Sequence, residues 1–169
     1  PPDKIPDALA VIDVHRKDDE YPCKDLCGTG VAFKLATAVS QRMGKPEAAF
    51  KYLDLVAVAT ASDIVPIVDE NRILVKEGLK MLNTSPRNSF AQLLELSGLK
   101  DKPVTTGNIV FTLAPRINAV GRMGDAKRAV QLLTCEDSDT ITEFAKVLQV
   151  VNEERRDVDK NITDDAFRM

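Results

Sequence analysis

Residues 52–67 read YLDLVAVATASDIVPI, a run of small and apolar residues that ends at Asp63 and a proline-containing turn. The part from Val56 to Ser62 fits either a strand or a helix. The alanine-rich approach to it, with Pro46 suited to the first position of a helix, favours the helix. We therefore expect a helix from Pro46 that presents Asp63 where it ends.

Helical patterns recur along the rest of the chain. Apolar residues at helical spacing, with capping residues before them and glycine or proline after them, predict further helices over 28–44, 70–82, 89–98, 105–113, 125–133 and from Asp137 towards the end. Pro115 is expected to stop the helix over 105–113. The segment 116–124 has two glycines and no apolar period, so it is expected to be a loop.

One segment has the pattern of a strand. Residues 8–14 read ALAVIDV, a short apolar run typical of a strand that is buried on both faces. A single strand cannot satisfy its own backbone hydrogen bonds, so the neighbouring strands are expected upstream of Pro1. The predicted fold class is therefore α/β for a longer protein. This chain is expected to be predominantly helical, with one short buried strand at the edge of a parallel sheet or paired with another copy.

Composition excludes few functions. The chain has 169 residues, 44% hydrophobic and 29% charged, with a net charge of −3, which is ordinary for a soluble globular domain. It has no apolar run long enough to cross a bilayer and no overall basic character. Three cysteines (Cys23, Cys27 and Cys135) without an export signal are expected to be reduced thiols in a cytoplasmic protein.

Three stretches carry a more specific signal. They are residues 52–67, closely followed by Glu70-Asn71-Arg72; residues 113–124, which read LAPRINAVGRMG; and Tyr21-Pro22 together with LCGTGVAFKL at 26–35. In this order and at these separations they resemble the RecJ family of single-strand-specific DNA exonucleases, in the DHH phosphoesterase superfamily. The resemblance covers essentially the whole chain, and NEERR at 152–156 looks like the start of the family's linking helix.

The resemblance implies a domain organisation. The family has a DHH catalytic domain on a parallel sheet, a long connecting helix and a DHH-associated second domain. By this resemblance residues 1–136 correspond to the C-terminal part of the catalytic domain, and 137–169 to the start of the linking helix. The DHH triplet would lie just before Pro1, with two further aspartate motifs upstream. The chain alone is therefore expected to be inactive.

The resemblance also implies an activity. The full-length protein would hydrolyse single-stranded DNA from the 5′ end to mononucleotides, in DNA repair and recombination, with two Mn²⁺ or Mg²⁺ ions. Its partners would be single-stranded DNA and, by family, single-strand-binding protein and a RecQ-type helicase, with no membrane. Two related alternatives stay open: a DHH-family phosphodiesterase acting on short oligonucleotides or cyclic dinucleotides, and a catalytically dead DHH scaffold protein.

Asp63 is the predicted metal ligand and catalytic residue. Two-metal hydrolysis of a phosphodiester needs several carboxylates to hold the ions. From the residues alone, the cap of a turn is the favoured reading of Asp63. The resemblance implies the metal ligand, because Asp63 matches the last of the family's metal motifs. Asp54, inside the expected helix, is interpreted as a structural hydrogen-bonding residue.

Arg116, Asn118 and Arg122 are the predicted DNA-binding and phosphate-binding residues. Arginine forks match phosphate oxygens, and the resemblance places this segment beside the DNA path. The alternative is that Arg116 and Asn118 tie the expected loop to acidic neighbours. Gly28-Thr29-Gly30, at a helix start, is interpreted as close packing rather than an anion site. His15, the only histidine, is interpreted as an exposed loop residue.

Overall fold

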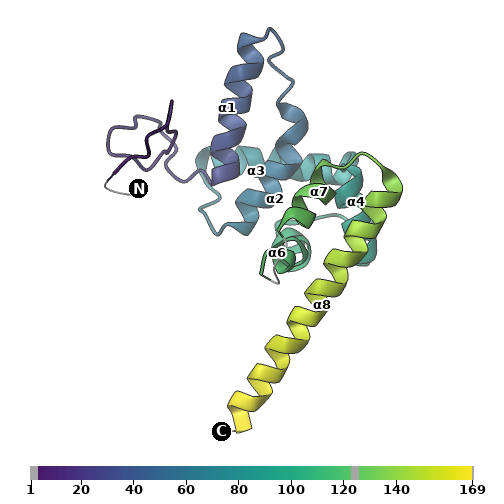
Figure 1. Cartoon of the computed structure of the whole chain (residues 1–169). Coiled ribbons are helices and arrows are strands. Elements are labelled where there is room, and N and C mark those ends of the chain that lie inside the picture. Colours follow the sequence, from purple (N-terminus) through teal and green to yellow (C-terminus); the bar gives the residue numbers. More distant parts are fainter. Residues whose placement is uncertain (1–3, 123–125, 169) are drawn as a thin grey trace. The chain divides into compact units, whose positions relative to one another are not determined.

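The computed structural model describes residues 4–122 and 126–168, and every regular element in these ranges is helical (Figure 1). The chain divides into two compact units, Pro1–Met81 and Leu82–Met169. Over the described ranges, no helix is both long enough and apolar enough to cross a membrane.

The first unit is built from three α-helices and a short 3-10 turn: α1 (Gly28–Arg42), η1 (Phe50–Tyr52), α2 (Leu53–Ser62) and α3 (Asp69–Thr84). α1 begins where the Cys27 sulfur accepts the Gly30 N–H at 3.4 Å, and it is followed by Gly44 at φ +70°. The core is apolar and consists mainly of Val14, Leu26, Phe33, Ala49, Val56 and Leu74. Burial of these side chains holds α1 and α2 together.

The helical prediction for residues 56–62 is confirmed, but its expected start at Pro46 is wrong. Residues 46–49 form turns, and η1 follows before α2 begins at Leu53. The backbone N–H groups of Ala48, Phe50 and Tyr52 each bond the carbonyl three residues back, which is the tighter 3-10 pattern. Proline at a helix start therefore favoured a turn here rather than a full α-helix.

Gly78 lets α3 cross α2 at close range. A Cβ atom at residue 78 would lie 2.2 Å from the Leu53 carbonyl oxygen and 2.4 Å from the Ala57 Cβ. No side chain larger than hydrogen fits that gap. The glycine in the middle of α3 therefore fixes the position of α2, the helix that leads to Asp63.

The predicted strand over residues 8–14 is wrong. The segment has no strand structure, Leu9 and Ile12 are exposed, and only Val14 reaches the core. Turns replace the strand: the Asp13 carboxylate accepts the His15 N–H at 2.9 Å, and the Arg16 side chain donates to the Val11 carbonyl at 3.2 Å. A single strand cannot satisfy its backbone hydrogen bonds, and the described residues contain no second strand to pair with this segment.

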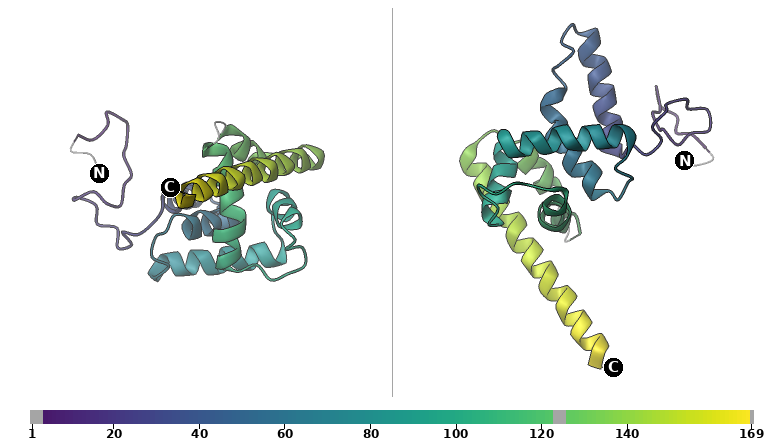
Figure 2. Two further views of the ribbon diagram at one scale, coloured as in Figure 1. Left: turned by 90° about the horizontal axis from the view of Figure 1, so that it is seen from below. Right: turned by 180° about the vertical axis from the view of Figure 1, so that it is seen from behind.

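The second unit contains α4 (Asn88–Leu96), α5 (Thr106–Asn108), the π-helical turn η2 (Ile109–Leu113), α6 (Ala114–Arg122), α7 (Lys127–Thr134) and α8 (Ser138–Arg168). α4, α6 and α7 each pack against α8 (Figure 2). The largest fully buried apolar side chains of this unit are those of Leu82, Phe90, Leu93, Ile109, Leu113, Leu132, Ile141 and Leu148.

The prediction of a loop over 116–124 is wrong for its described part, and Pro115 does not stop the helix. Residues 114–122 form α6, while 123 and 124 lie outside the described residues. In η2 the Ala114 N–H bonds the Ile109 carbonyl, five residues back. This wider turn directly before Pro115 accommodates a ring that would clash in a regular helix. Burial of Ala119 and Val120 then outweighs the low helix propensity of Gly121.

The predicted helix after Asp137 is confirmed as α8, 31 residues long (Figure 1). The Asp137 carboxylate accepts the Thr140 N–H at 2.8 Å, and its hydrogen bonding to Thr140 lowers the pKa of Asp137. Ile141, Ala145, Leu148 and Asn152 of α8 are buried, whereas nearly all residues after 152 are exposed. Only the first half of this helix therefore contributes to the core.

Candidate functional site

Asp63 is the residue at which α2 ends. Its backbone N–H donates to the Ala59 carbonyl at 3.0 Å, and its side chain is exposed. The C-terminus of a helix carries partial negative charge, so a carboxylate placed there adds to a negative potential. A divalent cation would neutralise that potential, and carboxylate oxygens are the ligands that Mg²⁺ and Mn²⁺ prefer. Asp63 therefore fits the role of one metal ligand.

A complete metal site needs more than Asp63. Over the described ranges, no three or more His, Cys, Asp and Glu side chains converge closely enough to hold a metal ion. One carboxylate binds such an ion only within a larger set of oxygen ligands. The described residues by themselves therefore do not form a complete metal site at Asp63.

The backbone directly after Asp63 is strained. Ile64 has φ +55° and is 95% exposed, and Asp69, at the start of α3, has φ +45°. For a β-branched residue the left-handed region is a true outlier, and such a conformation costs about 1–3 kcal/mol. Strain of this kind persists only where the surrounding structure imposes it, and it concentrates at functional sites. Nothing in the sequence around Ile64 predicts this conformation.

Asp54, the other carboxylate of α2, lies in a different environment. It is 1% exposed in the first turn of the helix, and its Oδ1 accepts the Leu55 N–H at 2.8 Å. The N-terminal end of a helix stabilises negative charge, so burial there is tolerable. This geometry agrees with the structural interpretation of Asp54.

At the first turn of α3 lies a cluster of three side chains whose pairing the sequence did not reveal. The Tyr21 hydroxyl donates to one carboxylate oxygen of Glu70 at 2.6 Å, and the Lys34 ammonium donates to the other at 2.6 Å. The ammonium also lies 5.6 Å from the centroid of the Tyr21 ring. The three residues come from two of the three stretches that carry the family resemblance. Their contacts join positions far apart in the chain, which periodicity cannot show.

Electrostatics keep Glu70 and Lys34 charged at neutral pH. Burial alone would raise the pKa of Glu70, but hydrogen bonds from Lys34 and Tyr21 outweigh burial and lower it. The hydrogen bond to Glu70 raises the pKa of Lys34. Burial, followed by the hydrogen bond to Glu70, raises the pKa of Tyr21. At neutral pH the cluster is thus an ion pair with a neutral phenol.

In the second unit, α6 separates the three residues predicted to bind phosphate. At about 100° per residue, Arg116 and Asn118 point about 160° apart around the helix, whereas Asn118 and Arg122 lie only about 40° apart. Both Asn118 and Arg122 are exposed. The structure therefore places Asn118 and Arg122 together on one exposed side of α6 and Arg116 on another.

Arg116 is engaged within the protein. Its Nε donates to Gln149 Oε1 of α8 at 2.6 Å, and its Nη1 donates to the Thr112 carbonyl at 2.7 Å. Burial lowers the pKa of Arg116, and the nearby charge of Arg156 lowers it further, whereas Glu153 opposes the shift. The alternative of a tie to acidic neighbours is thus replaced by a tie to an amide and a carbonyl.

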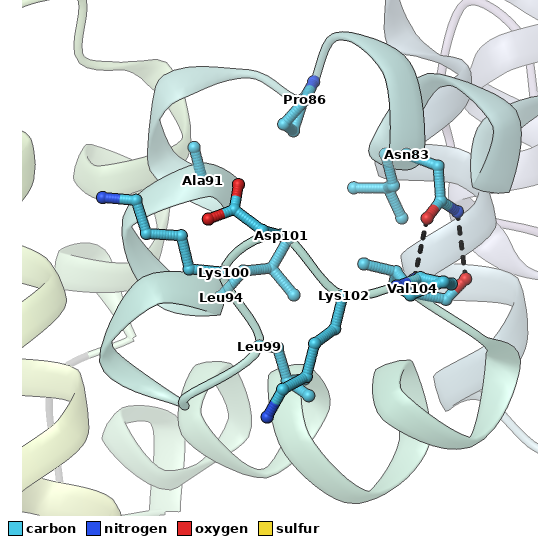
Figure 3. Close-up of a pocket in the computed structure, with 11 residues that line it drawn as sticks. Asn83, Pro86, Ala91, Leu94, Leu99, Lys100, Asp101, Lys102 and Val104 are labelled. Carbon is cyan, nitrogen blue, oxygen red and sulfur yellow. Dashed lines mark hydrogen bonds between the residues drawn. The ribbon is translucent and has the colours of Figure 1, made fainter.

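The second unit also has a pocket of about 410 Å³ between the end of α3, α4 and the loop 99–104 (Figure 3). The Asn83 side chain holds the loop at Val104, accepting its N–H at 2.7 Å and donating to its carbonyl at 3.0 Å. The two lysines at the rim are already bonded, Lys100 to Glu95 and Lys102 to the Gly98 carbonyl. Neither lysine of the lining is therefore left without a hydrogen-bond partner to bind an anion.

Comparisons with known proteins find relatives that share one name. No protein-family model matches the chain. The chain is 39% identical over 169 residues to the single-stranded-DNA-specific exonuclease RecJ of Bacillus subtilis, a match that covers 100% of the chain and 21% of that relative. The protein of the same name from Escherichia coli is 30% identical over 181 residues, with 100% and 31% covered.

Solved structures give the same result. The crystal structure of RecJ from Thermus thermophilus in complex with Mn²⁺ matches with a TM-score of 0.84 and 32% identity, over 96% of the chain and 24% of that structure. The structure of the same protein with Mg²⁺ matches with a TM-score of 0.77 and 34% identity, over 85% of the chain and 22% of that structure. The chain thus spans about a fifth to a third of the length of these relatives.

Proposed function

The chain belongs to the RecJ family, and from this membership we propose that the full-length protein containing it is a metal-dependent exonuclease that degrades single-stranded DNA. Curated relatives named for this specificity match the whole chain, and related structures hold Mg²⁺ or Mn²⁺. We extend the proposal to degradation in the 5′→3′ direction with mononucleotides as the product. The proposed process is DNA repair and recombination, and the proposed location is the cytoplasm.

Asp63 is the residue proposed to take part in the chemistry. The observation that supports this most directly is its position: an exposed carboxylate at the C-terminal end of α2, followed by a strained turn. When bound, a pair of divalent ions activates a water and stabilises the leaving oxygen of the phosphodiester. Asp63 itself supplies one carboxylate to hold an ion.

Asn118 and Arg122 are proposed to contact the DNA backbone. They share one exposed side of α6, and a guanidinium matches phosphate oxygens in charge and geometry. Arg116 belongs to the same proposed set, although its bonds to Gln149 and Thr112 leave only part of its guanidinium for a ligand. Its larger contribution is to hold α6 against α8.

The domain assignment is part of the same proposal. Residues 1–136 form the C-terminal part of the catalytic domain, and residues 137–169 begin the helix that links it to the next domain. Nearly all residues of α8 after residue 152 are exposed. A helix that buries no face is typical of a segment that bridges two domains through solvent, which supports a linking role. Single-strand-binding protein and a RecQ-type helicase are proposed as partners on the basis of family membership alone.

The function is tested on the full-length protein with 5′-labelled and 3′-labelled single-stranded DNA in Mn²⁺ or Mg²⁺. We expect mononucleotide release from the 5′ end that needs the metal, and none from duplex DNA. Asp63→Ala should abolish this release while single-strand binding without divalent metal persists, since Asp63 adds little attraction for a polyanion. Cleavage by Asp63→Ala at the unmodified rate would return Asp63 to the role of a turn residue.

Two alternatives give different results in the same assay. A phosphodiesterase for short substrates would cleave dinucleotides or cyclic dinucleotides much faster than long single strands. A catalytically dead scaffold would bind single strands and cleave nothing, with or without Asp63.

A further inference from the structure

We propose that Asn71 is a positioning residue for the metal site: its buried amide holds the turn that carries Asp63. This inference rests on the function proposed above, because it concerns the place of the proposed metal ligand. The proposal makes Asn71 act through the backbone next to Asp63, without contact with metal or DNA.

The contacts of Asn71 connect two separate segments of the first unit. Its side chain is 0% exposed, near the start of α3. Its amide nitrogen donates to the Pro66 carbonyl at 3.0 Å and to the Asp25 carbonyl at 2.8 Å. Both protons of the amide are thus used, one on the turn after Asp63 and one on the segment before α1.

The turn after Asp63 depends on this contact. Among the described residues, the bond from Asn71 to Pro66 is the side-chain hydrogen bond that ties residues 64–67 to the rest of the unit. Ile64 in this turn has φ +55°, a conformation that isoleucine disfavours. Without the bond from Asn71, the strained residue is free to relax, and the carboxylate of Asp63 moves with it.

Contacts of neighbouring residues fix the position of the helix turn that carries Asn71. Glu70, the preceding residue, binds Tyr21 and Lys34 and so fixes the start of α3 against α1 and the segment before it. The buried Cys27 sulfur and Thr60 hydroxyl lie 3.4 Å apart, which links the N-cap of α1 to the last turns of α2. Because the start of α3 is held in this way, the hydrogen bond from Asn71 holds the Pro66 carbonyl in place.

The presence of a buried asparagine at residue 71 indicates that its hydrogen bonds matter. The Oδ1 atom of Asn71 is buried without a hydrogen-bond partner in the part of the chain that the structure describes. An unpaired buried oxygen is unfavourable, and an apolar side chain of similar size would avoid it. An asparagine is thus explained by its two donors rather than by the space that it fills.

The test compares Asn71→Ala and Asn83→Ala in the full-length protein. Asn83 provides a matched control, because it lies on the same helix and also bonds a loop backbone, at Val104 (Figure 3). Two readouts are needed: the Mn²⁺ concentration that gives half-maximal cleavage, and the rise in melting temperature caused by Mn²⁺ without DNA. Mutation of a residue that orients a metal ligand typically lowers metal affinity by about 10–100-fold.

We expect Asn71→Ala to raise the half-maximal Mn²⁺ concentration by about tenfold or more and to reduce the Mn²⁺-induced rise in melting temperature. Asn83→Ala should lower the melting temperature without changing either metal readout. Asn71→Ser, which keeps one donor, should lie between Asn71→Ala and the unmodified protein, and it carries the test if Asn71→Ala does not fold.

Equal metal dependence of the Asn71 and Asn83 variants would overturn the inference, whether both shift or neither does. That result leaves the proposed function intact as long as the unmodified protein cleaves single strands with Mn²⁺. An unmodified protein that shows no Mn²⁺-dependent cleavage and no Mn²⁺-induced stabilisation refutes the proposed function itself.

Discussion

Gly78→Ala is expected to damage both the stability and the activity of the full-length protein, although alanine is the better helix former. The added Cβ would lie 2.2 Å from the Leu53 carbonyl oxygen, whereas ordinary contact begins at 3.4 Å. The two helices must therefore separate by about 1.2 Å (3.4 − 2.2). Neither the carbonyl oxygen nor the Ala57 Cβ can rotate away, so the backbone itself has to move.

The magnitude follows from two opposing effects. Replacing glycine by alanine inside a helix stabilises it by about 1 kcal/mol. Forcing an extra methyl group into a packed contact costs about 1–3 kcal/mol, and occasionally more when backbone must shift. Because both contacts are rigid, the cost lies at the upper end, and a net loss of about 2 kcal/mol results. For a domain of this size, that lowers the melting temperature by about 4–8 °C.

Activity should fall by more than the stability loss explains. α2 leads directly to Asp63, and a misplacement of about 1 Å at a catalytic group can reduce the rate about 100-fold. We expect such a loss in metal-dependent cleavage of single-stranded DNA, measured at a temperature where the variant is fully folded.

Gly107→Ala is the matched control, because an added Cβ there would meet only the Thr105 hydroxyl, at an ordinary 3.5 Å. Because nothing opposes the helix-propensity gain of up to about 1 kcal/mol, this variant should be no less stable than the unmodified protein, and its cleavage rate should stay the same. A Gly78→Ala protein as stable as the unmodified one would refute the close crossing of α2 and α3.

Three further outcomes are expected. The purified 169-residue chain should release no nucleotides from single-stranded DNA with Mn²⁺ or Mg²⁺, because its described residues lack a full ligand set, and measurable release would contradict this. Arg122→Ala in the full-length protein should lower the slope of log affinity against log salt by about 0.7, and an unchanged slope would exclude a phosphate contact. The lowered pKa of Glu70 stabilises the folded state above the ordinary value of 4.5 and loses this effect as the pH falls through the folded pKa. The difference in melting temperature between the unmodified protein and Glu70→Gln should therefore shrink below about pH 4.5, and a constant difference would argue against the ion pair with Lys34.

The sequence predicted the helices well where local signals and burial agree. The helix through residues 56–62 and the long helix after Asp137 each have either a run of buried small residues or a capping carboxylate, and both are present. Such features act within a few residues of the chain, so they can be read without the fold.

Where long-range packing decides, the sequence misled. The apolar run at 8–14 has strand character, yet a strand exists only with a partner that the described residues do not provide. Conversely, α6 lacks a clear apolar period and contains Gly121, yet burial of Ala119 and Val120 keeps it helical. Both errors have one cause: the competing energy lies in contacts with residues distant in the chain.

Asp63 was predicted as a candidate from the sequence, but the hydrogen-bonded cluster at the start of α3 was not. Tyr21, Lys34 and Glu70 appeared only as letters within family-like stretches, and their hydrogen bonds span 36 and 49 positions. The left-handed conformation of Ile64 was equally hidden, because isoleucine is among the residues least suited to it.

The two carboxylates of α2 illustrate how position along a helix separates structure from function. Asp54 lies in the first turn, where the helix dipole favours negative charge, and it can therefore be buried at 1% exposure. Asp63 lies at the opposite end, where the same dipole disfavours negative charge and where only solvent or a cation can offset it. A carboxylate in that place contributes little to folding, and the adjoining turn adds strain. Asp63 thus combines an unfavourable electrostatic position with a strained backbone beside it. A bound metal ion would offset the electrostatic cost, and a need to hold the carboxylate in one place would explain the strained turn.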